Sequence, residues 1–152
     1  MNITDISWRK LQSVRDDRGC LTAIEGGEAI PFEVKRVFYM HDVAEGADRG
    51  GHAHRDTDQF AVAVHGSLKI VVSNGYESRV VILDSPEWGI TLPRLTWTKL
   101  MDFSEGAVCL VLASTHYDRS KSIRSWPEYL AERGVPECQE VTTGPMLNRP
   151  VA

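Results

Sequence analysis

The stretch Arg49-Gly50-Gly51-His52-Ala53-His54-Arg55 decides the predicted fold and contains the predicted site. Its centre is a pair of histidines two positions apart. If the stretch is extended, His52 and His54 project from the same face of a β-strand into the space that this face encloses. Two imidazoles on one face, beside a Gly-Gly pair and two arginines, favour a functional site over chance placement on the surface or in the core.

The composition is that of an ordinary soluble globular protein. The chain has 152 residues, 42% hydrophobic and 25% charged, which is enough to bury a core as one domain without disulfides or metals. The net charge of −4, with no dominant basic run, argues against a dedicated binder of nucleic acid or of anionic membranes. A local basic pocket for a small anion remains compatible with this composition.

Cysteine usage and targeting patterns predict a cytoplasmic protein. Cys20, Cys109 and Cys138 are odd in number and far apart, so they define neither a disulfide framework nor a paired metal-ligand spacing. The sequence shows no basic-then-apolar signal at its start and no apolar run long enough to cross a bilayer. We therefore expect a cytoplasmic location and no membrane partner.

Most of the chain has the pattern of short β-strands separated by turns. Strands are expected within residues 6–14, 20–25, 32–43, 58–64, 67–73, 76–83, 88–92, 95–103 and 107–114, with 44–51 as a loop. Many short strands with turn chemistry between them are typical of an antiparallel barrel or sandwich. Between two of these strands, Asn74-Gly75 predicts a two-residue type I′ hairpin turn.

The C-terminal part departs from this pattern. Ser125 as N-cap and Gly134 as the residue after the last turn predict one short helix within residues 123–133. Residues 136–152 contain three prolines and few apolar residues, which predicts an extended or poorly ordered tail. No repeat or linker divides the chain, so we expect a single all-β domain over residues 1–135, followed by the tail.

The spacing of the histidine pair, Gln59 and Gly66 matches the first motif of the cupin jelly rolls, where a Glu normally stands at the position of Gln59. The second cupin motif places a His shortly after a Pro, and here Pro93 is followed by Thr98 at that position. The usual ligands of three histidines and a glutamate are thus reduced to two imidazoles, an amide and a hydroxyl. Because such a set binds divalent transition metals weakly, we expect a pocket without metal.

Without a metal, the histidine pair suits proton transfer. An imidazole titrates near neutrality, so it can remove a proton beside a carbonyl and return it to a neighbouring atom, which is isomerase chemistry. The developing enolate needs a donor aimed at its oxygen, and a second imidazolium, a tyrosine hydroxyl or an arginine can supply one. Tyr39 is a candidate third proton carrier, with a place at the rim of a mixed core as the alternative.

Four arginines and one tryptophan are candidates for binding a phosphorylated ligand that carries a base. Arg18, Arg36, Arg49 and Arg55 have the fork geometry that recognises phosphate oxygens, although such arginines taken singly are more often solvated or ion-paired at the surface. Trp97 offers a stacking face for a base, with core packing as the alternative.

Several further segments accompany the histidine pair: Lys35–Tyr39, Leu83–Pro86 with Gly89, Trp97, Met101–Ser104, and Val111–Ser114 with Tyr117–Asp118. Together they resemble the sugar 3,4-ketoisomerases, also described as WxcM-like cupins, over about residues 5–130. Members of that family move the ketone of dTDP-4-keto-6-deoxy-D-glucose from C4 to C3, ahead of transamination to a 3-amino sugar. The resemblance implies a cupin jelly roll without metal or other cofactor, and a homodimer with exchanged N-terminal strands.

The resemblance also implies roles for individual residues. His54 is the first choice for the catalytic base and His52 the second, with Tyr39 as a further catalytic candidate. The expected substrate-binding residues are Arg49, Arg18, Arg36, Gln59, Trp97 and Thr98, of which Arg49 lines the sugar and pyrophosphate pocket together with Tyr39.

Two positions depart from the family pattern. Gly51 stands where an aromatic residue is common, and Thr98 stands where relatives carry His or Arg, near the face of C4 that receives the proton. The stereochemistry at C4 therefore stays open. A nucleotide-sugar 3,5-epimerase and a catalytically silent nucleotide-sugar-binding cupin are the alternatives, and a metal-dependent oxygenase is disfavoured by the missing Glu and His.

Overall fold

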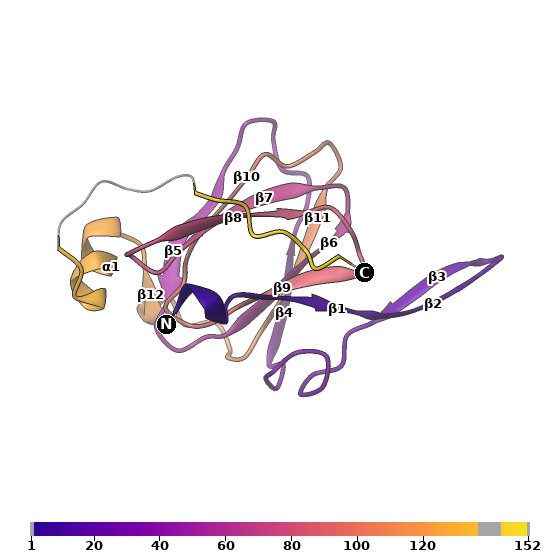
Figure 1. Ribbon diagram of the computed structural model, residues 1–152, viewed down its shortest axis with the longest axis horizontal. Coiled ribbons are helices and arrows are strands. Elements are labelled where there is room, and N and C mark those ends of the chain that lie inside the picture. Colours follow the sequence, from indigo (N-terminus) through magenta and orange to yellow (C-terminus); the bar gives the residue numbers. More distant parts are fainter. Residues whose placement is uncertain (1, 137–143, 152) are drawn as a thin grey trace.

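The computed structural model describes residues 2–136 and 144–151, which form two packed antiparallel sheets, a projecting hairpin and one short helix (Figure 1). The elements are η1 (Ile3–Asp5), β1 (Ser7–Lys10), β2 (Gln12–Asp16), β3 (Gly19–Ala23), β4 (Arg36–Met40), β5 (Arg49–His54), β6 (Gln59–His65), β7 (Leu68–Ser73), β8 (Ser78–Leu83), β9 (Trp88–Leu92), β10 (Trp97–Met101), β11 (Val108–Ala113), η2 (Arg119–Lys121), β12 (Ser122–Ile123) and α1 (Trp126–Arg133). This arrangement confirms the predicted all-β fold with a short C-terminal helix.

The two sheets enclose the main core. One has the strand order β1-β9-β6-β11-β4 and the other β12-β5-β10-β7-β8. Along β6, Ala61 and Ala63 join the core between the sheets, whereas Phe60 and Val62 face the opposite side, where a second cluster around Ile30 covers them. This alternation follows from the two-residue period of a strand and leaves small side chains on the inner face. The inner face of β6 therefore leaves space between the sheets.

The predicted helix and both of its caps are confirmed. The Ser125 hydroxyl accepts a hydrogen bond from the Glu128 amide at 3.4 Å, and Gly134 ends the helix with a φ of 68°. The buried Tyr129 hydroxyl donates to the Leu95 carbonyl at 2.6 Å. This contact helps to fix α1 against the outer face of the sheet that carries the histidine pair.

The predicted type I′ turn is wrong. Ser73 pairs with Ser78, so the loop spans the four residues 74–77 and not two. A type I′ turn needs positive φ at both central residues, and of the pair only Gly75 has one. The Asn74 side chain explains the difference, since its oxygen accepts hydrogen bonds from the Tyr76 and Glu77 amides, each at 2.9 Å.

The β2–β3 hairpin projects from the body of the protein, at the end opposite α1 (Figure 1). Val14 and Leu21 pair across it and are 63% and 65% exposed. At its tip, Arg18 forms an ion pair with Asp16 at 2.6 Å. The hairpin therefore presents apolar side chains to solvent, away from both sheets.

The described part of the C-terminal tail is extended along an edge of the second sheet. The Val80 amide on β8 donates to the Pro145 carbonyl at 3.0 Å, and the Leu147 amide donates to the Val80 carbonyl at 2.8 Å. The tail thus covers the backbone groups of an edge strand. Residues 137–143, including Cys138, and residue 152 lie outside the described residues. Within the described ranges, no helix is long and apolar enough to cross a membrane.

Candidate active site

The histidine pair lies on the inner face of β5. Ala53 between the two histidines is fully buried against the cluster around α1, so His52 and His54 point the other way, into the space between the sheets. Their ring centroids are 4.8 Å apart and the rings are nearly perpendicular, at 80°. The predicted side-by-side placement is confirmed.

The strand that carries the pair begins at Arg49, inside the segment predicted as a loop. Gly50 and Gly51 both have positive φ, of 88° and 76°, and the pairing with β10 shifts register between Thr98 and Lys99. A Cβ at Gly50 would come within 2.9 Å of the Thr98 carbonyl oxygen, so this position needs a glycine. The Gly-Gly pair therefore lets an irregular strand approach β10 closely.

A cavity of about 210 Å³ opens between the sheets beside His52. It is lined by Phe38, Tyr39, Met40, Arg49, Gly50, His52, Gln59, Ala61, Ile70, Leu92, Thr98, Leu100 and Val111. Gln59 and Thr98 are buried, and Thr98 is the partner of His52 across the two strands. The structure thus brings Arg49, Gln59 and Thr98 together with His52, as the sequence predicted.

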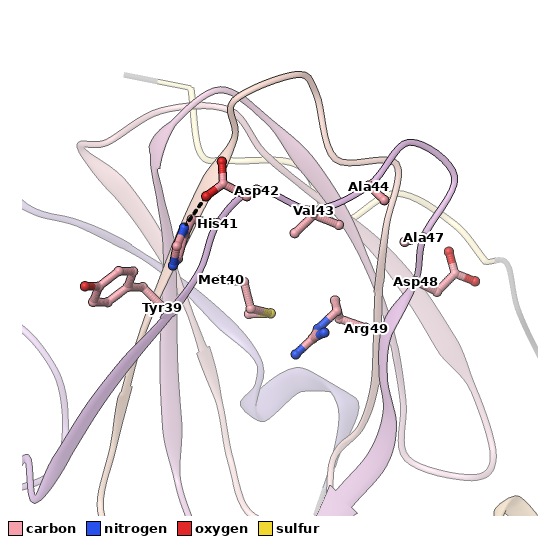
Figure 2. A pocket seen from close by; sticks show the side chains of 9 residues that line it. All are labelled: Tyr39, Met40, His41, Asp42, Val43, Ala44, Ala47, Asp48 and Arg49. Carbon is pink, nitrogen blue, oxygen red and sulfur yellow. Dashed lines mark hydrogen bonds and ion pairs between the residues drawn. The ribbon is translucent and has the colours of Figure 1, made fainter.

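A second cavity, of about 410 Å³, lies over the loop that joins β4 to β5 and shares Tyr39, Met40 and Arg49 with the first. Figure 2 shows the Arg49 and Met40 side chains directed toward the opening, whereas Tyr39 and His41 lie on the other side of β4. Within the described residues the Arg49 guanidinium forms no ion pair. The mouth of the inner cavity therefore presents a cation without a counterion.

Tyr39 borders both cavities, but its ring is not directed toward the histidine pair. Phe38 and Met40 pack against the main core, so the alternation along β4 places Tyr39 on the outer face, where it is 61% exposed. Its ring contacts His41 at a centroid distance of 5.5 Å. The sequence did not determine which face of this strand points inward. In the structure the inward face carries Phe38 and Met40, and Tyr39 is on the opposite face.

Two further predicted site residues also lie elsewhere. Trp97 is 5% exposed and packs on the outer side of β10, with ring centroids 5.2 Å from Trp126 and 5.4 Å from Tyr129. These surroundings correspond to core packing, which was the alternative to stacking on a base. Arg18 is at the tip of the projecting hairpin, where its charge is paired with Asp16.

Burial and neighbouring cations hold both histidines neutral. Burial is the main cause that lowers the pKa of His54 to about 4, and the charges of His52 and Arg36 add to it, while Asp56 acts in the opposite direction. The pKa of His52 is also lowered, by burial first and then by Arg124. At neutral pH both imidazoles are therefore free to accept a proton.

Sequence reasoning missed two residues next to the pair. The two-residue strand β12 pairs with β5, and its Ser122 hydroxyl lies 3.5 Å from Nδ1 of His54. Ile123 is fully buried on the outer side, so Arg124 follows on the side of the histidines. The only sequence signal was one apolar residue flanked by polar ones, and this pattern is too short to identify a strand.

The donors around the pair do not fit a cupin metal site. Within the described parts of the chain, no group of three or more His, Cys, Asp or Glu side chains could hold a metal ion. The cavity instead supplies an amide at Gln59 and a hydroxyl at Thr98. Neither provides the anionic ligand that two imidazoles need to bind a divalent transition metal firmly.

Comparisons with known proteins agree with this geometry. The family model FdtA (WxcM-like, C-terminal) matches residues 4–134. TDP-4-oxo-6-deoxy-alpha-D-glucose-3,4-oxoisomerase of Aneurinibacillus thermoaerophilus is 36% identical over 118 residues, which are 78% of this chain and 85% of the relative. QdtA, a sugar 3,4-ketoisomerase from Thermoanaerobacterium thermosaccharolyticum solved with TDP, has a TM-score of 0.85 at 35% identity, over 88% of this chain and 97% of QdtA. A histidine-to-asparagine mutant of QdtA, solved with TDP-4-keto-6-deoxyglucose, has a TM-score of 0.84 at 35% identity, over 87% and 96%.

These matches confirm the resemblance inferred from the sequence and the enzyme class, an isomerase. The family match includes every strand of both sheets and helix α1, and it ends at the glycine that caps this helix. The chain belongs to the FdtA family of WxcM-like sugar 3,4-ketoisomerases.

Proposed function

We propose that this protein moves the ketone of a dTDP-linked 4-keto-6-deoxyhexose from C4 to C3 without a metal or other cofactor. The observation that carries the proposal is the neutral histidine pair, with rings 4.8 Å apart, of which His52 lines the cavity between the sheets. Its support comes from relatives of the family, among which QdtA binds TDP and a QdtA mutant binds TDP-4-keto-6-deoxyglucose.

In the proposed reaction, His54 removes the proton from C3. The electron pair of the C3–H bond becomes the C3=C4 double bond, and the carbonyl π pair moves onto O4. A proton then passes from O3 to O4 through His52. The His54 imidazolium exchanges its proton with solvent and delivers a proton to C4, which leaves the ketone at C3. Base, enediolate and acid steps balance without an external oxidant or reductant.

Arg49 is the proposed contact for the diphosphate. It lies at the mouth shared by the two cavities and has no counterion among the described residues. Gln59 and Thr98 lie deeper, beside His52, and contact the sugar. A charged group at the mouth and neutral polar groups inside match a ligand whose sugar enters first.

The test is an NMR time course of dTDP-4-keto-6-deoxyglucose with the protein in deuterated water. We expect a 3-keto product with deuterium at C4, and the same spectra report whether C4 has the galacto or gluco configuration. A 4-keto product with exchanged or inverted C3 and C5 would instead identify an epimerase. Thermal stabilisation by the sugar nucleotide with no change in the spectra would identify a silent binding protein.

The proposed assembly is a homodimer that exchanges N-terminal strands. The β2–β3 hairpin projects from the sheets and exposes Val14 and Leu21, an apolar surface that a second copy would cover (Figure 1). Leu21→Asp is expected to shift the mass measured by light scattering from dimer toward monomer, with Arg15→Asp on the same hairpin as control. A native protein of monomeric mass contradicts the proposal.

A further inference from the structure

Arg36 is an inward-facing cation next to the histidine pair. It begins β4 and shares the inner face with Phe38 and Met40, which pack against the main core. Its guanidinium carbon lies 5.2 Å from the Phe38 ring centroid and 5.4 Å from that of Tyr117. Two aromatic rings therefore hold the guanidinium in place, and this side chain needs little rearrangement to contact a ligand.

The side chain of Arg36 lacks the partners that a structural arginine usually has. In the described residues it forms no ion pair, and its Nε is buried without a hydrogen-bond acceptor. Such an unsatisfied buried donor destabilises a folded protein. The terminal nitrogens are not among the buried unpaired atoms and form no hydrogen bond within the described residues, so they are accessible to solvent. An anionic ligand would supply the missing counter-charge.

The position of Arg36 along β4 separates it from the mouth. Met40 lies at the mouth, and Arg36 is four residues earlier on the same face, which corresponds to about 13 Å along a strand. Arg49 and His54 are separated in a similar way along β5. Arg36 thus lies at the depth of His54, and the positive charge of Arg36 lowers the pKa of His54. It lies away from the proposed diphosphate contact at Arg49.

We propose that Arg36 is a catalytic residue that stabilises the negative charge developing on O4 of the sugar. The inference rests on the proposed ketone migration and replaces Tyr39, which faces outward, as the donor to the enolate oxygen. When His54 takes the C3 proton, the charge that reaches O4 is neutralised by the guanidinium. As the proton moves from O3 to O4, the charge shifts to O3, and the second arm of the planar fork accommodates it.

The experiment compares Arg36→Met and Arg36→Lys with Lys35→Met, which removes an exposed charge from the adjacent position. Methionine keeps apolar packing between the two rings, and lysine keeps the charge without the fork. We expect Arg36→Met to lower kcat by about 100- to 1,000-fold, as for loss of an oxyanion donor, with unchanged affinity for TDP. Arg36→Lys recovers part of kcat, and Lys35→Met behaves as the native protein.

A further readout and a fallback variant keep the inference testable. The pKa of His54, followed by NMR, is expected to rise in Arg36→Met, because a nearby positive charge has been removed. If Arg36→Met does not fold, Arg36→Lys must still show a lower kcat with native TDP affinity. An equal loss of TDP affinity and of kcat/KM would assign Arg36 to diphosphate binding and overturn the inference.

The outcomes also separate this inference from the proposed function. A native protein that leaves the keto sugar unchanged overturns both. A native protein that forms the 3-keto product, together with an Arg36→Met variant of native kcat, overturns only the role of Arg36.

Discussion

Replacing His54 with Asn is expected to lower kcat for ketone migration by about 100- to 10,000-fold, the range that general-base catalysis supplies. Asparagine keeps a polar side chain of similar reach but cannot accept a proton at working pH. The fold is expected to persist, because β5 is held by its pairing with β10 and β12 and by the burial of Ala53. Affinity for TDP is expected to remain native.

The measurement is the initial rate of 3-keto product formation by NMR, with His41→Asn as the matched control. His41 is exposed and paired with Asp42 at 2.8 Å, outside the histidine pair. His52→Asn is expected to retain exchange of the C3 proton with solvent while losing product formation, since its role lies in the transfer between oxygens. A His54→Asn variant that turns over at the native rate would remove His54 as the base.

The same residue sets an expected pH dependence. The ordinary histidine pKa is 6.5, and burial lowers the pKa of His54 to about 4, so His54 in the free enzyme stays in its basic form down to this lower value. The acidic limb of kcat/KM is therefore expected near pH 4 and not near 6.5. The free energy of unfolding is also expected to decrease as pH falls from 6.5 toward 4, because in this range His54 binds a proton in the unfolded chain but not in the folded chain.

The part of the site that follows local rules was predictable from the sequence. The i, i+2 spacing alone places His52 and His54 on one face once the segment is a strand. Spacing to Gln59 and Thr98 then identified neighbours that the structure brings to the same cavity. Both inferences need only strand geometry and a known two-motif pattern, and neither depends on how the sheets pack.

The residues that sequence reasoning misplaced depend on which face of a strand is buried. Tyr39 and Trp97 were assigned to the site, but β4 buries Phe38 and Met40, and β10 turns Trp97 toward α1. Alternation defines two faces without saying which is inside. Arg124 was missed because its position depends on the pairing of a two-residue strand with β5, a contact that spans about seventy residues of sequence.

Replacing Trp97 with Ala is expected to lower the free energy of unfolding by about 3–5 kcal/mol, the usual cost of removing a buried tryptophan. Its ring packs against Trp126 and Tyr129 and joins α1 to the outer face of the sheet, directly behind Ala53 and the histidines. Loss of the ring leaves a cavity that α1 cannot fill, because the Tyr129 hydroxyl is tied to the Leu95 carbonyl.

Urea unfolding measures this loss, and TDP affinity distinguishes it from a binding role. A tryptophan that stacked on the base would contribute about 1–3 kcal/mol to binding, so its removal would weaken TDP binding at least several-fold. The packed arrangement predicts native TDP affinity in the folded fraction of Trp97→Ala, or of Trp97→Phe if the alanine variant is too unstable. Tyr39→Ala, which removes an exposed aromatic ring, is the stability control and is expected to change unfolding by no more than about 0.5 kcal/mol. Native stability combined with weakened TDP binding in Trp97→Ala would return this residue to the substrate site, and would require the helix-covered face of β10 to open when the nucleotide binds.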